Sequence, residues 1–248
     1  ERDDRHPLVI CGGSGALNPD ALADFVDVFC LGDGEELIVE IVDFVREWKR
    51  QGRGSRDDML RQLARIWGVY VPRFYEPRYH ADGTIAAVEP IVEGLRPRAV
   101  KRFVQELPPP LTRPIVPYLQ TVHDRMAIEI QRGCTQGCRF CQAGMIYRPR
   151  LERGPEEVVA ATRELIRNTG YDELSLVSLS TTDHSRINEI VEGLRAEFGA
   201  SITISLPSMR VDSFSVRVSE AVATRGKHNI TFAPEAGTER LRMTIIKI

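Results

Sequence analysis

The sequence predicts an α/β protein whose C-terminal half forms a parallel β-sheet flanked by helices. Apolar runs of strand length lie at residues 125–131, 173–180, 201–206 and 229–234. The segments between them carry apolar residues at the three- and four-residue spacing of amphipathic helices. Strands that alternate with helices form right-handed βαβ units, in which neighbouring strands run parallel.

The helices of this half have recognisable boundaries. The first should begin at Gly154-Pro155 and run to about Asn168, because Pro is favoured in the first helical turn. A second is expected around residues 187–198, and a third over 213–226, where Gly226 ends it. In parallel sheets the chemistry lies where the strands end, so the loops after these strands are the first place to look for a site.

The first 55 residues predict a smaller α/β layer. Residues 7–11 and 27–32 are short apolar strands, Asn18-Pro19 predicts a helix start, and Asp33-Gly34-Glu35-Glu36 predicts another. We interpret this layer as part of a Rossmann-like domain. Gly13-x-Gly15 does not complete the dinucleotide-binding fingerprint G-x-G-x-x-G, because Asn18 stands where the third Gly should be.

Residues 56–124 are expected to be an irregular connector. A short helix is predicted within 57–72, ending near Gly68, and Asp82-Gly83 between extended flanks predicts a hairpin. The five prolines of 106–120 predict an extended linker and a domain boundary. We therefore divide the chain into 1–55, 56–124 and 125–248.

Composition and charge narrow the class of protein. The formal net charge of −2 gives no overall basic field for nucleic acid, and no apolar run approaches the ~20 residues of a membrane-spanning helix. The N-terminus lacks a signal-peptide apolar core and an initiator Met, so a cytoplasmic chain and a piece of a longer protein are expected. Three of the five cysteines are clustered, which favours a metal site in a reducing compartment over a disulfide framework.

The clustered cysteines are Cys134, Cys138 and Cys141, spaced C-x3-C-x2-C directly after the strand at 125–131. Three thiolates on one loop can hold three corners of a cubane iron–sulfur cluster, which leaves the fourth iron open to a small molecule. This motif, with Phe140 before the third Cys, resembles the radical S-adenosylmethionine (SAM) superfamily. The resemblance implies that the three cysteines bind a [4Fe–4S] cluster, that Phe140 contacts the adenine, and that reductive cleavage of SAM gives a 5′-deoxyadenosyl radical.

Other uses of the cysteines stay open at this point. Structural zinc would need four closed ligands, and a redox pair of Cys138 and Cys141 would leave Cys134 unused. A closed ferredoxin-type cluster would need Cys11 or Cys30 as a fourth ligand. We expect Cys11 and Cys30 to be small buried residues of strands instead.

The resemblance also implies SAM-binding residues after the later strands. They are Ser180, Thr181, Thr182 and Asp183 after the second strand, Ser205, Ser208 and Arg210 after the third, and Glu235 after the fourth. Asp183 supplies the charge for the methionine amino group, Arg210 suits the SAM carboxylate, and Glu235 suits the ribose hydroxyls. Helix capping by Asp183 and a helix N-terminal role for Glu235 are the alternatives.

Five arginines surround the cysteine loop and could bind an anionic substrate such as RNA, or form a solvated rim. They are Arg132, Arg139, Arg148, Arg150 and Arg153. The family also implies a reductant such as flavodoxin or ferredoxin. No membrane partner is expected.

The resemblance can be narrowed. The N-terminal segment, with Gly32-Asp33-Gly34-Glu35, resembles the later half of the cobalamin-binding domain of bacterial B12-binding-domain radical SAM proteins, although the cobalt-ligand motif Asp-x-His-x-x-Gly does not occur. The expected fold is then a partial (β/α) radical SAM barrel with about four of six units, preceded by part of that domain. The function expected is a radical SAM enzyme of unknown substrate; the alternatives are an RNA-modifying methyltransferase or methylthiotransferase and a non-catalytic iron–sulfur redox module.

Overall fold

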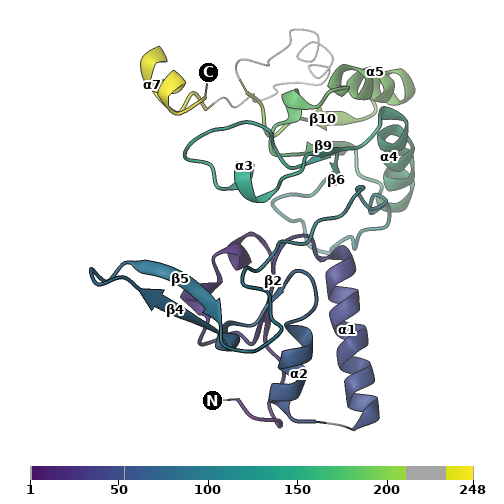
Figure 1. Cartoon of the computed structure of the whole chain (residues 1–248). Helices are drawn as coiled ribbons and strands as arrows, with labels where there is room; N and C mark the ends of the chain where they lie inside the picture. Colours follow the sequence, from purple (N-terminus) through teal and green to yellow (C-terminus); the bar gives the residue numbers. More distant parts are fainter. Residues whose placement is uncertain (1, 53, 211–232, 248) are drawn as a thin grey trace. The chain divides into compact units, whose positions relative to one another are not determined.

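The computed structural model describes residues 2–52, 54–210 and 233–247. The chain divides into two compact units, Glu1–Val104 and Gln105–Ile248 (Figure 1). Each unit has its own sheet and its own apolar core. Among the described residues, no helix has the length and apolar character needed to cross a bilayer.

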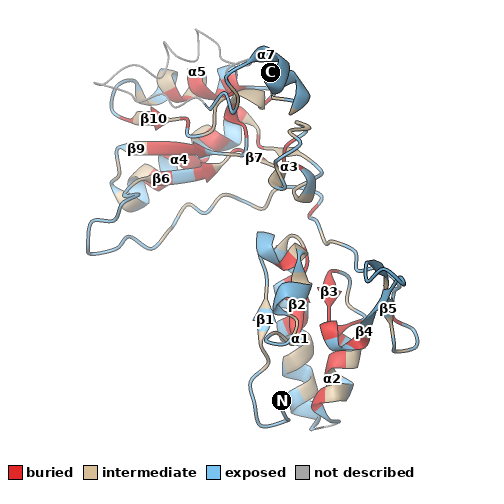
Figure 2. Cartoon of the chain, turned by 90° about the vertical axis from the view of Figure 1, so that its left-hand side faces the viewer, coloured by how far each residue is buried: buried red, intermediate tan, exposed pale blue. Residues whose placement is uncertain are grey.

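The first unit is built on a three-stranded sheet. Strand β2 (Val28–Cys30) lies between β1 (Ile10–Cys11), to which it is parallel, and β3 (Val69–Tyr70), to which it is antiparallel. Helices α1 (Gly34–Gln51) and α2 (Arg56–Leu63) bury Leu37, Ile41, Leu60 and Leu63 in the core beside this sheet (Figure 2). Cys30 is buried and Cys11 is half-buried, and both lie in strands as expected.

Two helices expected in the first unit are shorter than their sequence patterns. The turn η1 (Ser14–Leu17) precedes Asn18, and after Asn18 the chain forms only the 3₁₀ turn η2 (Pro19–Leu22), because it must return to β2 at Val28. Helix α2 is opened by a Ser55–Asp58 capping box and ends at Leu63. The following residues enter β3 instead, and Gly68 at φ +93° makes the turn.

Residues 56–104 belong to the first unit rather than to a separate connector. Besides α2 and β3 they supply η3 (Pro72–Phe74) and the antiparallel hairpin of β4 (Tyr75–Tyr79) and β5 (Ile85–Pro90). The structure therefore differs from the expected three-part division in this region. The hairpin turns at Asp82-Gly83, where Oδ1 of Asp82 accepts the backbone N–H of Thr84 at 3.0 Å.

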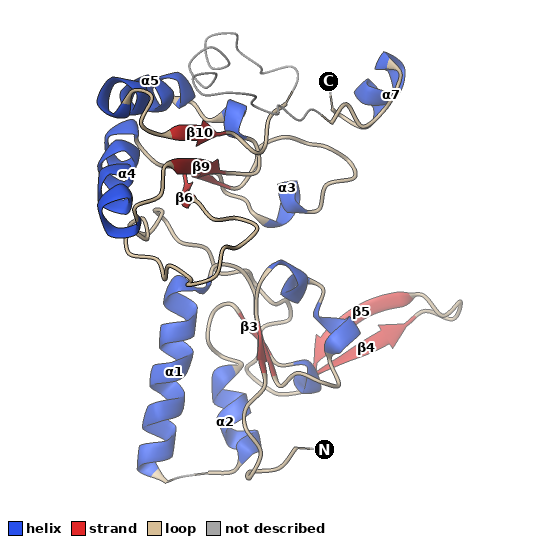
Figure 3. Cartoon of the chain, turned by 180° about the vertical axis from the view of Figure 1, so that it is seen from behind, coloured by secondary structure: helices blue, strands red, loops and turns tan. Residues whose placement is uncertain are grey.

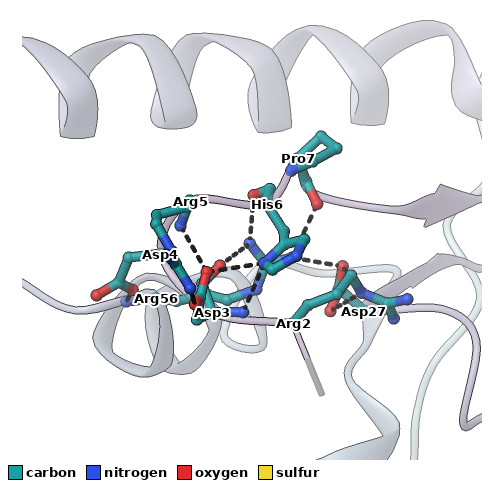
Figure 4. Close-up of polar contacts among 8 residues, drawn as sticks. All are labelled: Arg2, Asp3, Asp4, Arg5, His6, Pro7, Asp27 and Arg56. Carbon is teal, nitrogen blue, oxygen red and sulfur yellow. Dashed lines mark hydrogen bonds and ion pairs between the residues drawn. The ribbon is translucent and has the colours of Figure 1, made fainter.

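A buried arginine ties the N-terminal segment to the first unit (Figure 4). The Arg56 guanidinium donates to the carbonyls of His6 at 2.8 Å and Pro7 at 3.0 Å, and it pairs with Asp27 at 2.7 Å. The Asp27 carboxylate also accepts the backbone N–H of Val9 at 2.8 Å. These contacts hold the segment before β1 against the start of α2, which no local sequence pattern indicates.

The second unit contains the parallel sheet that the sequence predicts. Its described strands are β6 (Met126–Glu129), β9 (Glu173–Val177) and β10 (Thr203–Ser205), in the order β10-β9-β6. Helices α4 (Pro155–Thr169) and α5 (Ile187–Phe198) cover one face of it, and the strand ends point to the side where α3 (Ala143–Ile146) lies (Figure 3).

The predicted helix over 213–226 lies outside the described residues. So does most of the strand expected at 229–234; Ala233 and Pro234, which are described, are not in a strand. The remaining described elements of this unit are β7 (Gln131–Arg132), β8 (Leu151–Glu152), η4 (Thr181–Asp183) and α7 (Glu239–Thr244).

Candidate cluster and cofactor site

The two ends of the cysteine loop are held together by a pair of short strands. Strand β7 pairs antiparallel with β8, so that Arg132 lies opposite Leu151 and the residues between them form a closed loop. Gly133 makes the first turn with φ +81°, and a Cβ there would lie 2.2 Å from the carbonyl oxygen of Tyr147. Only Gly fits this close approach, which the sequence pattern did not indicate.

The three cysteines lie on this loop as free thiols. Cys134 is buried, while Cys138 and Cys141 are half-buried. Burial raises the pKa of the Cys134 thiol above its usual value, the N–H of Gln136 lowers it, and the charge of Asp183 adds to the rise. The loop is thus partly shielded from water without being sealed.

The sulfur atoms are not gathered around a common point, as we had expected them to be. Within the described ranges, no three His, Cys, Asp or Glu side chains are close enough to hold a metal ion. The sulfurs accept contacts from the protein instead: Gln136 N–H lies 3.4 Å from Sγ of Cys134, and Nη1 of Arg210 lies 3.6 Å from Sγ of Cys138. The donor set still fits an iron–sulfur cluster, because three thiols on one short loop can each bind one iron of a cubane and leave the fourth iron open.

Asp183 lies beside this loop. It is in η4, in the loop that follows β9, and its Oδ2 accepts a hydrogen bond from Nε2 of Gln136 at 3.0 Å. Its backbone carbonyl accepts a hydrogen bond from Arg150 at 3.1 Å. Two residues of the cysteine loop therefore contact the residue expected to bind the methionine amino group.

Arg210 reaches the same loop from the next strand. Its side chain contacts Cys138, and its backbone N–H donates to Oγ1 of Thr182 at 3.3 Å. Nearby, the carbonyl of Ser208 accepts the N–H of Thr181 at 2.7 Å. These bonds join the loops after β9 and β10, so Thr182, Asp183, Ser208 and Arg210 form one group at the carboxyl ends of the strands.

Two serine candidates lie closer to the sheet. Ser205 is level with Ser175 and Ala127 across the three strands, on the face opposite the helices. Ser180 is buried, and in the part of the chain that the structure describes its hydroxyl oxygen has no hydrogen-bond partner. A buried hydroxyl without a partner is a site where a bound ligand could supply one.

Phe140 and Glu235 both lie close to the ammonium group of Lys247. Phe140 is exposed, and Nζ of Lys247 lies 5.8 Å from the centre of its ring. The same ammonium pairs with Glu235 at 2.7 Å. Lys247 had not been singled out, because nothing in the local sequence connects it to the cysteine loop.

The arginines around the loop are largely engaged within the chain. Arg132 pairs with Glu129 at 2.8 Å, Arg150 with Glu152 at 3.4 Å, and Nε of Arg148 donates to a backbone carbonyl at 2.9 Å. Arg153 is buried and pairs with Glu157. This arrangement gives no support to a basic surface built for RNA.

His184 directly follows η4, and the sequence did not indicate it as a functional residue. The backbone N–H of Arg186 donates to Nδ1 at 3.0 Å, which assigns the proton of the neutral ring to Nε2. Nε2 then donates to the carbonyl of Arg153 at 3.1 Å. Burial lowers the pKa of His184, so the ring is neutral in the folded protein at neutral pH.

We expect this histidine to make the second unit less stable in mild acid. The pKa of His184 is lower in the folded than in the unfolded chain, where it is about 6.5. The stabilisation that the neutral ring contributes to the fold is therefore complete above pH 6.5 and is lost as the pH falls below that value. One proton limits the slope to about 1.4 kcal/mol per pH unit. The free energy of unfolding can be measured at several pH values by urea unfolding followed by circular dichroism. It should depend less steeply on pH in His184→Gln than in the unchanged chain. His123→Gln, at an exposed position, should match the unchanged chain; equal slopes in all three proteins would contradict the assignment.

Two family models match the chain. Residues 128–247 match the radical SAM superfamily, and residues 1–72 match the N-terminal region of radical SAM proteins. Together the two matches cover well over half of the chain. The chain belongs to the radical SAM superfamily.

This membership agrees with the expected radical SAM class and favours neither alternative function. Radical SAM proteins use a [4Fe–4S] cluster and SAM, and their cores are (β/α) barrels, in agreement with the parallel strands of the second unit. The more specific resemblance to B12-binding-domain proteins is not shown, since the first unit matches an N-terminal region of radical SAM proteins instead.

One curated relative is an uncharacterised protein of Methanocaldococcus jannaschii. It is 32% identical over 120 residues, which are 48% of this chain and 26% of the relative. The chain spans about a quarter of the length of that relative.

Proposed function

We propose that this chain carries the cluster- and SAM-binding part of a radical SAM enzyme. The observation that supports it best is the meeting of three strand ends: the C-x3-C-x2-C loop after β6 is contacted by Asp183 after β9 and by Arg210 after β10. Ligands of α/β folds bind at this edge of the sheet.

In this proposal, Cys134, Cys138 and Cys141 hold a [4Fe–4S] cluster. When bound, the cluster and SAM together supply a 5′-deoxyadenosyl radical, which abstracts hydrogen from the substrate. The sequence and the site do not favour one substrate class, and the engaged arginines give RNA no advantage.

In this proposal, the side chains around the cysteine loop bind and orient SAM. Asp183 offers a carboxylate to the amino group of SAM, and Arg210 offers a guanidinium to its carboxylate. The Arg210 guanidinium also lies against Cys138, with Nη1 at 3.6 Å from Sγ. Ser180, Thr182, Ser205 and Ser208 supply hydroxyls, Phe140 supplies a ring for the adenine, and Glu235 supplies a carboxylate for the ribose.

Cobalamin was the further cofactor implied by the narrower resemblance, and the residues present do not fit it. The two histidines of the first unit are His6, which contacts Asp3 before β1, and His80, which lies at the turn of the hairpin. Neither completes the cobalt-ligand motif Asp-x-His-x-x-Gly, which does not occur in this sequence. A reductant such as flavodoxin or ferredoxin is part of the proposal because the cleavage of SAM consumes one electron. A reducing cytoplasmic compartment is part of it because the cysteines must stay free thiols to bind iron.

Anaerobic reconstitution with iron and sulfide tests this function. We expect a brown protein whose reduced cluster changes its electron paramagnetic resonance (EPR) signal when SAM is added, and which forms methionine and 5′-deoxyadenosine. A stable cluster that responds to SAM in neither assay would support the redox module instead. A colourless protein that retains zinc would support a structural zinc site.

A further inference from the structure

Gln136 lies between the first two cysteines, and its backbone is fixed on both sides. Its N–H lies 3.4 Å from Sγ of Cys134. Its carbonyl accepts a hydrogen bond from Nη2 of Arg148 at 3.4 Å and lies against Gly144, where a Cβ would approach it to 3.3 Å. The direction of the Gln136 side chain is therefore set by the fold of the cysteine loop.

That side chain is directed at Asp183. The two residues are 47 positions apart, and Nε2 of Gln136 lies 3.0 Å from Oδ2 of Asp183. Both are half-buried, so the hydrogen bond is partly protected from water. A bond between an amide donor and a carboxylate is stronger than one between neutral groups.

The backbone of Asp183 is held independently of Gln136. Its N–H donates to the carbonyl of Ser180 at 3.1 Å, and its carbonyl accepts a hydrogen bond from Arg150. The described residues provide no hydrogen bond to Oδ1 of its carboxylate. One carboxylate oxygen is thus held by Gln136, and the other is left for a ligand.

We propose that Gln136 is a positioning residue that aims the Asp183 carboxylate at the amino group of SAM. The inference rests on the proposed function. Gln136 fixes Oδ2, so that Oδ1 meets the ammonium without a loss of side-chain freedom on binding. Because Gln136 also contacts Cys134, it links the SAM site to the ligand loop of the cluster through one residue.

A purely structural role for Gln136 makes a different prediction. If its amide only held the loop closed, its removal would reduce the iron retained by the protein. A positioning role leaves the iron content unchanged and weakens the binding of SAM. The two roles are separated by measuring iron per chain and SAM binding on the same samples.

The experiment uses the full chain, reconstituted anaerobically, with SAM titrated against the EPR signal of the reduced cluster. Gln136→Leu and Gln136→Met should each raise the SAM concentration for a half-maximal change about tenfold, at unchanged iron content. Gln142→Leu is the matched control: it is the same substitution in the same loop, at an exposed residue whose side chain makes no capping bond.

A double variant decides whether Gln136 acts through Asp183. In an Asp183→Asn background, Gln136→Leu should weaken SAM binding less than twofold further. The proposal would be overturned if the two substitutions weakened SAM binding independently, so that their fold-changes multiplied. It would also be overturned if Gln136→Leu lost iron in parallel with SAM binding, or if it bound SAM as tightly as the unchanged chain. If the unchanged chain retains a cluster whose signal does not respond to SAM, the proposed function fails, and this inference fails with it.

Discussion

Replacing any one of Cys134, Cys138 or Cys141 with alanine is expected to remove the cluster from the reconstituted protein. In the proposed site each thiolate binds a separate iron, and the loop offers no spare cysteine to replace it. Iron content and visible absorption should fall more than tenfold, because even losing a partner outside the ligand set costs roughly 10–100-fold in metal affinity. SAM cleavage should be lost with the cluster.

Cys11→Ala is the control, because Cys11 lies in β1 of the first unit. Its iron content should equal that of the unchanged chain. Loss of iron in Cys11→Ala or Cys30→Ala would identify a fourth cysteine ligand and a closed cluster. A normal cluster after replacement of any loop cysteine would refute the ligand assignment.

Replacing Arg56 with methionine should destabilise the first unit by about 3–5 kcal/mol. The Arg56 and Asp27 side chains are only 6% and 9% exposed, so the variant leaves a buried carboxylate without its closest partner. It also removes the donors to the carbonyls of His6 and Pro7. Arg2, which contacts Asp27 at 3.2 Å, offsets part of the loss.

Tryptophan fluorescence during urea unfolding measures this effect selectively, because Trp48 and Trp67 are the two tryptophans of the chain and both belong to the first unit. Arg5→Met is the control: its ion pair with Asp3 lies in the same segment, but the Arg5 side chain is 87% exposed. An exposed pair contributes about 0–1 kcal/mol. If Arg56→Met unfolds at the same urea concentration as Arg5→Met, the buried network does not anchor the segment.

Sequence patterns were sufficient where a structure depends on neighbouring residues. The three cysteines lie within eight positions, so their spacing alone predicted that they share one loop, which the pairing of β7 with β8 closes. The period-two pattern of Met126, Ile128 and Ile130 predicted a strand, and β6 buries Met126 and Ile128 against the helices. Hairpin and helix starts followed equally local rules, as at Asp82-Gly83 and Pro155.

Local patterns were insufficient where pairing with a distant strand decided which secondary structure a segment adopts. The helical spacing of 57–72 continues past Leu63, but the structure ends α2 there because Val69 and Tyr70 are needed in the sheet. The segment after Asn18 has a good helix start yet forms only the 3₁₀ turn η2. In both places tertiary pairing of strands outweighed a helical preference worth less than about 1 kcal/mol per residue.

The sequence by itself determined the position of the cysteine loop, the alternation of strands and helices, and, through them, the radical SAM family of this protein. Only the tertiary structure decided which distant side chains serve that loop: Gln136 meets Asp183 across 47 positions, and Cys138 meets Arg210 across 72. The physical reason is one of range. Backbone periodicity and ligand spacing act over a few residues, whereas the ends of parallel strands converge only once the helices between them have packed on the sheet.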